Sequence, residues 1–142
     1  MYDTILVPID GSDESYSAAE EAVELVAADG VLHALFVIEE LPMYRRSGKA
    51  GKFDEGDPER HDRAEAAIER ASTLADEAGI DCETAILEGV PSREIVDYAE
   101  SIDADAIVLG KRGLSAAASD MLGSTTERVI RSADTTVVSV PC

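Results

Sequence analysis

Residues 105–125 read DAIVLGKRGLSAAASDMLGST, a strand, loop and helix pattern that sets the fold class. The first five residues form a short apolar run, which predicts a strand buried on both faces of a sheet. A glycine-containing loop from Gly110 to Leu122 follows, and Gly123-Ser124 then opens a helix expected to reach about Ser132. This order places a loop and a helix N-terminus at the end of a buried strand.

The same alternation of strands and helices runs through the rest of the chain. Further strands are predicted at 4–9, 31–38, 82–88 and 135–140. The first predicted helix begins after Ser12, its N-cap, and runs to about Ala28, where Asp29-Gly30 stops it. Two more helices are predicted from Pro58 to about Ala78 and from about Ser92 to Ser101. Because strand–helix–strand crossovers are right-handed, this alternation predicts one parallel sheet with helices on both faces, in a single α/β domain over residues 1–142.

The composition narrows the class of protein. The 142 residues include 30 acidic and 12 basic side chains, for a net charge of -18, which argues against nucleic acid and anionic membrane surfaces as partners. Acid spread along the chain with few lysines favours a protein of high-salt cytoplasm, a halophile, over a generic acidic protein. Cys82 and Cys142 lack metal-ligand spacing, so we expect free thiols. The first residues do not resemble a signal peptide, and no apolar run is long enough to span a membrane, so a cytoplasmic location is expected.

A candidate phosphate site is formed by Gly110-Lys111-Arg112-Gly113, nine further residues, and Gly123-Ser124-Thr125. The motif leads into a helix N-terminus, which offers unpaired backbone N–H groups and the positive end of a helix dipole. Glycines let the backbone approach a ligand closely, and the two hydroxyls add donors. A single loop glycine with an N-cap serine would be the simpler interpretation, but the combination favours a phosphate site.

The spacing Gly110-x2-Gly113-x9-Gly123-Ser124 resembles the ATP-binding signature of the universal stress proteins. The resemblance extends over the whole chain. Its other parts are ILVPIDGS at 5–12, Val37-Ile38-Glu39, Gly89-Val90-Pro91 and VVSVP at 137–141. It implies a Rossmann-like five-stranded sheet of order 3-2-1-4-5.

The resemblance also implies a ligand, ATP with Mg²⁺, and a role for each matching residue. It places Asp10 at the ribose or adenine end, the backbone of Val37 against adenine, and the glycine motif at the phosphates. The full set of expected ligand-binding residues is Pro8, Asp10, Val37, Gly110, Lys111, Arg112, Gly113, Gly123, Ser124 and Thr125. A general rule agrees, because ligands of parallel sheets bind at the carboxyl ends of strands where the order reverses, here between the first and fourth strands.

Eight of the 12 basic residues fall in two short segments, 45–52 and 111–131. One interpretation is a positive funnel for an anion, with the irregular loop from Glu39 to Pro58 as a lid. The other is a solvated loop, with Arg128 and Arg131 complementing a helix C-terminus. Of the two histidines, His33 is expected to pack in the core, and His61 to lie on a charged helix surface.

The leading functional hypothesis is a nucleotide-dependent regulatory module of the stress response, a homodimer through the edge strand at 136–140, as is common in the family. No general base is identified, so no catalytic residue is assigned and at most weak ATP hydrolysis is expected. The alternatives are a slow ATPase or nucleotidyl transferase, and a dimeric interaction module without ligand. A flavodoxin-like protein is more distant, because its phosphate loop would follow the first strand, where Asp10 and Asp13 stand.

Overall fold

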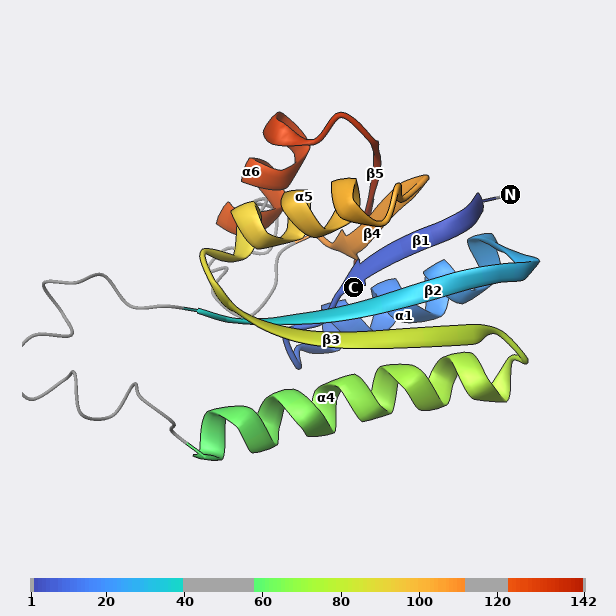
Figure 1. Ribbon diagram of the computed structural model, residues 1–142, viewed down its shortest axis with the longest axis horizontal. Helices are drawn as coiled ribbons and strands as arrows, with labels where there is room; N and C mark the ends of the chain where they lie inside the picture. Colours follow the sequence, from blue (N-terminus) through green and yellow to red (C-terminus); the bar gives the residue numbers. More distant parts are fainter. Residues whose placement is uncertain (1, 40–57, 112–122, 142) are drawn as a thin grey trace, which may run out of the picture.

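The computed structural model describes residues 2–39, 58–111 and 123–141, which form a parallel five-stranded sheet with flanking helices (Figure 1). The strand order β3-β2-β1-β4-β5 confirms the predicted topology. In chain order the elements are β1 (Tyr2–Pro8), α1 (Asp13–Leu25), β2 (Val26–Glu39), α4 (Pro58–Glu77), β3 (Asp81–Gly89), α5 (Pro91–Ser101), β4 (Ala106–Gly110), α6 (Ser124–Ser132) and β5 (Thr136–Val140).

The helices cover the two faces of the sheet in pairs, α1 with α4 and α5 with α6 (Figure 1). Each face has its own apolar core, because alternate side chains of a strand point to opposite faces. Ile5, Val7 and Val108 lie in the core beneath α1 and α4, whereas Leu6 and Ile107 lie in the core beneath α5 and α6. All five side chains are fully buried, which explains why the central strands are apolar without alternation.

The boundary between α1 and β2 differs from the prediction. The helix was expected to reach about Ala28, but it ends at Leu25, and β2 begins at Val26 rather than at residue 31. Val26 is extended, its side chain is buried, and it pairs with Tyr2 of β1. Gly30 therefore lies inside β2, where a Cβ atom would come within 2.6 Å of the Asp3 carbonyl oxygen. Close packing of β2 on β1, and not a helix stop, accounts for this glycine.

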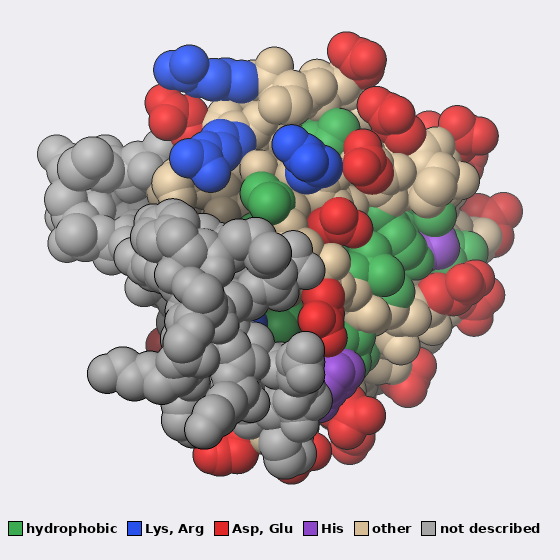
Figure 2. Space-filling model, turned by 60° about the vertical axis from the view of Figure 1, so that its left-hand side comes forward, with side chains coloured by type: hydrophobic (Ala, Val, Ile, Leu, Met, Phe, Trp, Pro, Cys, Tyr) green, Lys and Arg blue, Asp and Glu red, His purple; other side chains and the backbone are tan. Residues whose placement is uncertain are grey.

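Strand β5 forms one edge of the sheet. Only one side of β5 pairs within the described part of the chain, with β4. Acidic side chains are spread over the face seen in Figure 2 rather than gathered in one patch. Of the helices that the structure describes, none combines the length and the apolar character needed to cross a membrane.

Candidate functional site

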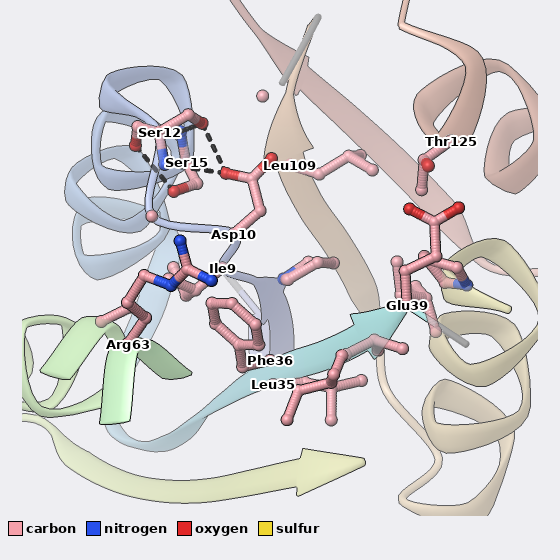
Figure 3. A pocket seen from close by; sticks show the side chains of 18 of the residues that line it. Ile9, Asp10, Ser12, Ser15, Leu35, Phe36, Glu39, Arg63, Leu109 and Thr125 are labelled. Atoms are coloured by element: carbon pink, nitrogen blue, oxygen red, sulfur yellow. Dashed lines mark hydrogen bonds between the residues drawn. The ribbon is translucent and has the colours of Figure 1, made fainter. Parts of the chain in front are cut away.

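A cavity of about 860 Å³ opens at the carboxyl ends of β1, β2 and β4, where the strand order reverses (Figure 3). Its floor is apolar and includes Ile9, Leu35, Phe36 and Leu109. Helices from both layers supply its walls: the first turn of α1, one side of α4, and the N-terminal ends of α5 and α6. A cavity of this size with a few polar groups on an apolar floor is typical of small-molecule sites.

Asp10 stands on the wall of this cavity, in the turn that joins β1 to α1 (Figure 3). Its Oδ1 accepts hydrogen bonds from the backbone N–H of Ser12, at 2.9 Å, and from the Ser12 hydroxyl, at 2.5 Å. The Ser12 Oγ in turn accepts from the backbone N–H of Ser15 at 3.1 Å, which confirms Ser12 as the N-cap of α1. The same turn that caps the helix thus fixes the orientation of the Asp10 carboxylate.

The N-terminus of α6 reaches the cavity from the other side, because two hydrogen bonds fasten it to the end of β4, which a third joins to β5. The Thr126 hydroxyl donates to the Gly110 carbonyl at 2.8 Å, the Gly123 N–H donates to the Lys111 carbonyl at 2.9 Å, and the Lys111 N–H donates to the Val140 carbonyl at 2.9 Å. Gly123 is the N-cap and offers no side chain to the first-turn amides. These amides have no partner within the helix, so the first turn can bind an anion.

Gly110 has a packing role that its place in the motif did not predict. A Cβ atom at this position would lie 2.8 Å from the Cβ of Glu14 and 3.1 Å from its backbone carbonyl group. The glycine therefore lets α1 pack against the end of β4. Close approach of a ligand is not needed to explain it.

The structure brings together five of the ten predicted ligand-binding residues: Pro8, Asp10, Val37, Gly110 and Thr125 all line the cavity. Gly123 is buried at the start of α6, Ser124 is exposed beside it, and Lys111 is half-buried at the end of β4. Arg112 and Gly113 lie outside the described residues, as does most of the proposed lid. Five of the eight predicted residues that the structure describes therefore line one cavity.

The basic residues that line the cavity are not those that the sequence singled out. Arg60, Arg63 and Arg70 come from one side of α4, where they are about one and about two helical turns apart. Arg131, by contrast, bonds Glu127 on the surface of α6 at 3.2 Å, which favours the second interpretation for that part of the basic cluster. The helical spacing of the α4 arginines was visible in the sequence, but the packing of α4 beside the end of β1 was not.

The three α4 arginines have different surroundings. The Arg70 guanidinium lies 3.9 Å from the centroid of the buried Tyr16 ring, a cation–π contact. Arg60 donates a hydrogen bond to the backbone carbonyl of Glu39 at the end of β2. Arg63 points into the cavity toward Asp10, above Phe36 (Figure 3).

The histidines and the described cysteine lie away from this cavity. His33 is buried in β2, as expected of a core side chain, and burial lowers its pKa. The centroids of the His33 and Tyr98 rings are 6.0 Å apart in an edge-to-face arrangement. His61 lies on the surface, 3.7 Å from Glu88. Burial raises the pKa of the free Cys82 thiol. Among the described residues, no group of three His, Cys, Asp or Glu side chains is placed to hold a metal ion.

Comparison with known proteins identifies relatives over the whole chain. The model of the universal stress protein family matches residues 1–141. A universal stress protein of Methanocaldococcus jannaschii is 33% identical over 141 residues, which cover 99% of this chain and 82% of that protein.

Solved structures agree with this result. A hypothetical protein of the same organism superimposes with a TM-score of 0.86 and 26% identity, covering 100% of this chain and 97% of that one. A universal stress protein in complex with cAMP gives a TM-score of 0.73 at 30% identity, covering 98% and 97%. One from Archaeoglobus fulgidus in complex with dAMP gives 0.69 at 25%, covering 97% of both chains.

Proposed function

The chain belongs to the universal stress protein family, and from this premise we propose that it binds an adenine nucleotide in the cavity at the ends of β1, β2 and β4. One observation carries the proposal: the first turn of α6, which has no side-chain cap, borders the same cavity as the Asp10 carboxylate. A helix N-terminus suits phosphate, and a carboxylate suits the hydroxyls of a ribose. The relatives in complex with cAMP and dAMP support the same class of ligand.

Within this class we propose ATP. Pro8, Asp10 and Val37 line the cavity, and we assign Pro8 and Val37 to the base and Asp10 to the ribose. We assign the phosphate chain to the glycine motif, in which the amides and hydroxyls of Ser124 and Thr125 act as donors. The remaining motif residues with this role are Gly110, Lys111, Arg112, Gly113 and Gly123. We assign Mg²⁺ to the ligand, because the described residues offer no metal cluster of their own and phosphates bind this cation well.

We propose that the protein acts as a regulatory module through its nucleotide-bound state, with slow hydrolysis at most. Rapid hydrolysis needs a group that orients water and cations on the transferred phosphoryl group. The acidic side chains that line the described cavity are Asp10 and Glu39, and Oδ1 of Asp10 already accepts two hydrogen bonds from Ser12. Phosphate release with Mg²⁺ is therefore expected far below the roughly 10 s⁻¹ of a median enzyme.

We further propose that residues 1–142 form a single domain and that the protein is a homodimer. The open edge of β5 supports this, since unpaired edge strands tend to pair with a second copy. The distributed acidic surface and the free Cys82 thiol support a reducing, high-salt cytoplasm as its location. Sedimentation at high KCl tests the dimer, and a monomer at micromolar concentration would contradict it.

The nucleotide proposal is tested by calorimetric titration of ATP into the wild type and Asp10→Ala. Loss of a hydrogen bond to a charged group is expected to weaken binding by about 1–3 kcal/mol, or roughly 5- to 150-fold. Asp97→Ala, on the exposed surface of α5, is the matched control and is expected to bind like the wild type. Asp10→Asn keeps an acceptor for Ser12 and shows by its melting temperature how much of the effect comes from the turn.

Two outcomes count against the proposal at different levels. A folded Asp10→Ala variant with unchanged affinity removes Asp10 from the site. A folded wild type that binds neither ATP nor AMP at millimolar concentration overturns nucleotide binding itself.

A further inference from the structure

The described lining of the cavity has a higher ratio of basic to acidic side chains than the whole chain has. Among the described residues that line it are three of the 12 basic side chains of the protein but only two of the 30 acidic ones, Asp10 and Glu39. In a chain of net charge -18, this local excess of positive charge favours an anionic ligand over a neutral one. The three cations all come from α4, the helix on the opposite face of the sheet from α6.

The α4 arginines are thus separate from the helix N-terminus proposed to hold the phosphate chain. In Figure 3, Thr125 of α6 and Arg63 of α4 lie on opposite sides of the cavity, with Asp10 between them. A single phosphate chain that extends from Asp10 toward α6 leads away from Arg63. In this arrangement the Arg63 guanidinium lies outside the path proposed for a 5′-phosphate chain.

Arg63 differs from the other two α4 arginines in its contacts. Arg60 bonds the Glu39 carbonyl and Arg70 stacks on Tyr16. For Arg63, the described part of the chain shows no hydrogen bond and no ion pair, and its side chain is exposed at the cavity. A guanidinium presents a rigid fork of donors that matches the oxygens of a phosphate.

We propose that Arg63 forms a second anion subsite, which binds a phosphate on the ribose of a nucleotide whose 5′-phosphate lies at α6. This inference rests on the proposed nucleotide site and deepens it by naming the ligand class, an adenosine bisphosphate with one phosphate on the 2′ or 3′ oxygen. In dinucleotide-binding folds, an acidic residue pairs with the free ribose hydroxyl and a nearby arginine accommodates a phosphate there. Here Asp10 and Arg63 face the same part of the cavity, so the arginine also offsets the repulsion between the carboxylate and that phosphate.

The test compares three ligands by calorimetry: adenosine 5′-monophosphate, adenosine 2′,5′-bisphosphate and adenosine 3′,5′-bisphosphate. They are titrated into the wild type, Arg63→Gln and Arg93→Gln at one KCl concentration at which circular dichroism shows all three proteins folded. Arg93 is an exposed arginine of α5 outside the cavity lining and serves as the matched control. The 2′ and 3′ ligands show which ribose oxygen carries the recognised phosphate.

We expect at least one bisphosphate to bind the wild type and Arg93→Gln about five- to twenty-fold more tightly than the monophosphate, the range for one charged hydrogen-bonding group at a partly exposed site. Arg63→Gln is expected to lose this preference while its affinity for the monophosphate stays within about two-fold. Equal or weaker binding of both bisphosphates by the wild type overturns the subsite and leaves the nucleotide proposal standing. An equal loss for all three ligands in Arg63→Gln also overturns it, because Arg63 would then act only as a counterion of Asp10. Failure of the monophosphate and both bisphosphates to bind the wild type removes the nucleotide site and this inference together.

Discussion

Replacing Gly110 with alanine tests whether this glycine is required by packing or by a ligand. Gly110 does not have a positive φ, so its backbone conformation suits any residue. Where a glycine is free of strain and contacts, alanine stabilises a protein by about 0.4–1 kcal/mol, because it restricts the unfolded chain. Here the new Cβ atom would lie 2.8 Å from the Glu14 Cβ and 3.1 Å from the Glu14 carbonyl carbon and oxygen. Because backbone atoms of a packed helix cannot move aside at little cost, the sign of the effect reverses.

We expect Gly110→Ala to lower the free energy of unfolding by about 1–3 kcal/mol, the usual range for overpacking in a core. For a chain of this length that is a fall in melting temperature on the order of 3–10 °C. Urea denaturation of the ligand-free protein measures the change. Adding Glu14→Gly removes the nearest contact, so the double variant is expected to lose less than the sum of the single losses. A ligand-free Gly110→Ala protein as stable as the wild type, or more stable, would refute the packing argument.

Two further predictions concern buried polar groups. Burial lowers the pKa of His33 below 6.5, so the unfolded chain binds more protons than the folded one as pH falls through this range, and stability conferred by the neutral ring is lost on acidification. Relative to His33→Leu, the wild type should therefore lose up to about 1.4 kcal/mol per pH unit below pH 6.5 in urea titrations, and a His61→Gln control should behave like the wild type. Thr126→Val should cost about 1–2 kcal/mol in the same assay, because the Gly110 carbonyl loses its 2.8 Å donor, whereas Thr125→Val should change little. Parallel pH profiles for wild type and His33→Leu, or an unchanged Thr126→Val, would contradict these assignments.

Much of the fold follows from the sequence because the central strands are continuous apolar runs. The run at 105–109 and its glycine loop predicted a buried parallel strand, and β4 is fully buried over Ala106–Gly110. Ser12 was recognised as an N-cap because its hydroxyl precedes an amphipathic helix, a signal within one turn of chain. The start of β2 was missed because the pairing of Val26 with Tyr2 is a contact between distant segments. Local sequence favoured a helix there, and tertiary pairing prevailed.

The site shows the same division between local and distant signals. Asp10 and Gly110 were predicted to lie together because the order of a parallel sheet brings the ends of the first and fourth strands together, and both line the cavity. Arg63 could not be placed in that way, because its position depends on how α4 packs against the sheet. That packing relies on a stripe of small residues, Ala64, Ala67 and Ala71, whose spacing indicates a buried face but not the strand end it will approach. Sequence reasoning therefore found the residues at strand ends and at the N-terminus of α6, and missed the arginines along α4.

The hydrogen bond from Arg60 to the Glu39 carbonyl has a consequence for how the chain tolerates change in length. It joins two positions that are 21 residues apart, at the exit of β2 and in the first turn of α4. The entropy of closing a loop grows only with the logarithm of its length, so doubling the intervening segment costs about 0.6 kcal/mol. Insertions between these two anchors are therefore expected to cost the sheet little stability. The segment between β2 and α4 is where this architecture can acquire new sequence without refolding its core.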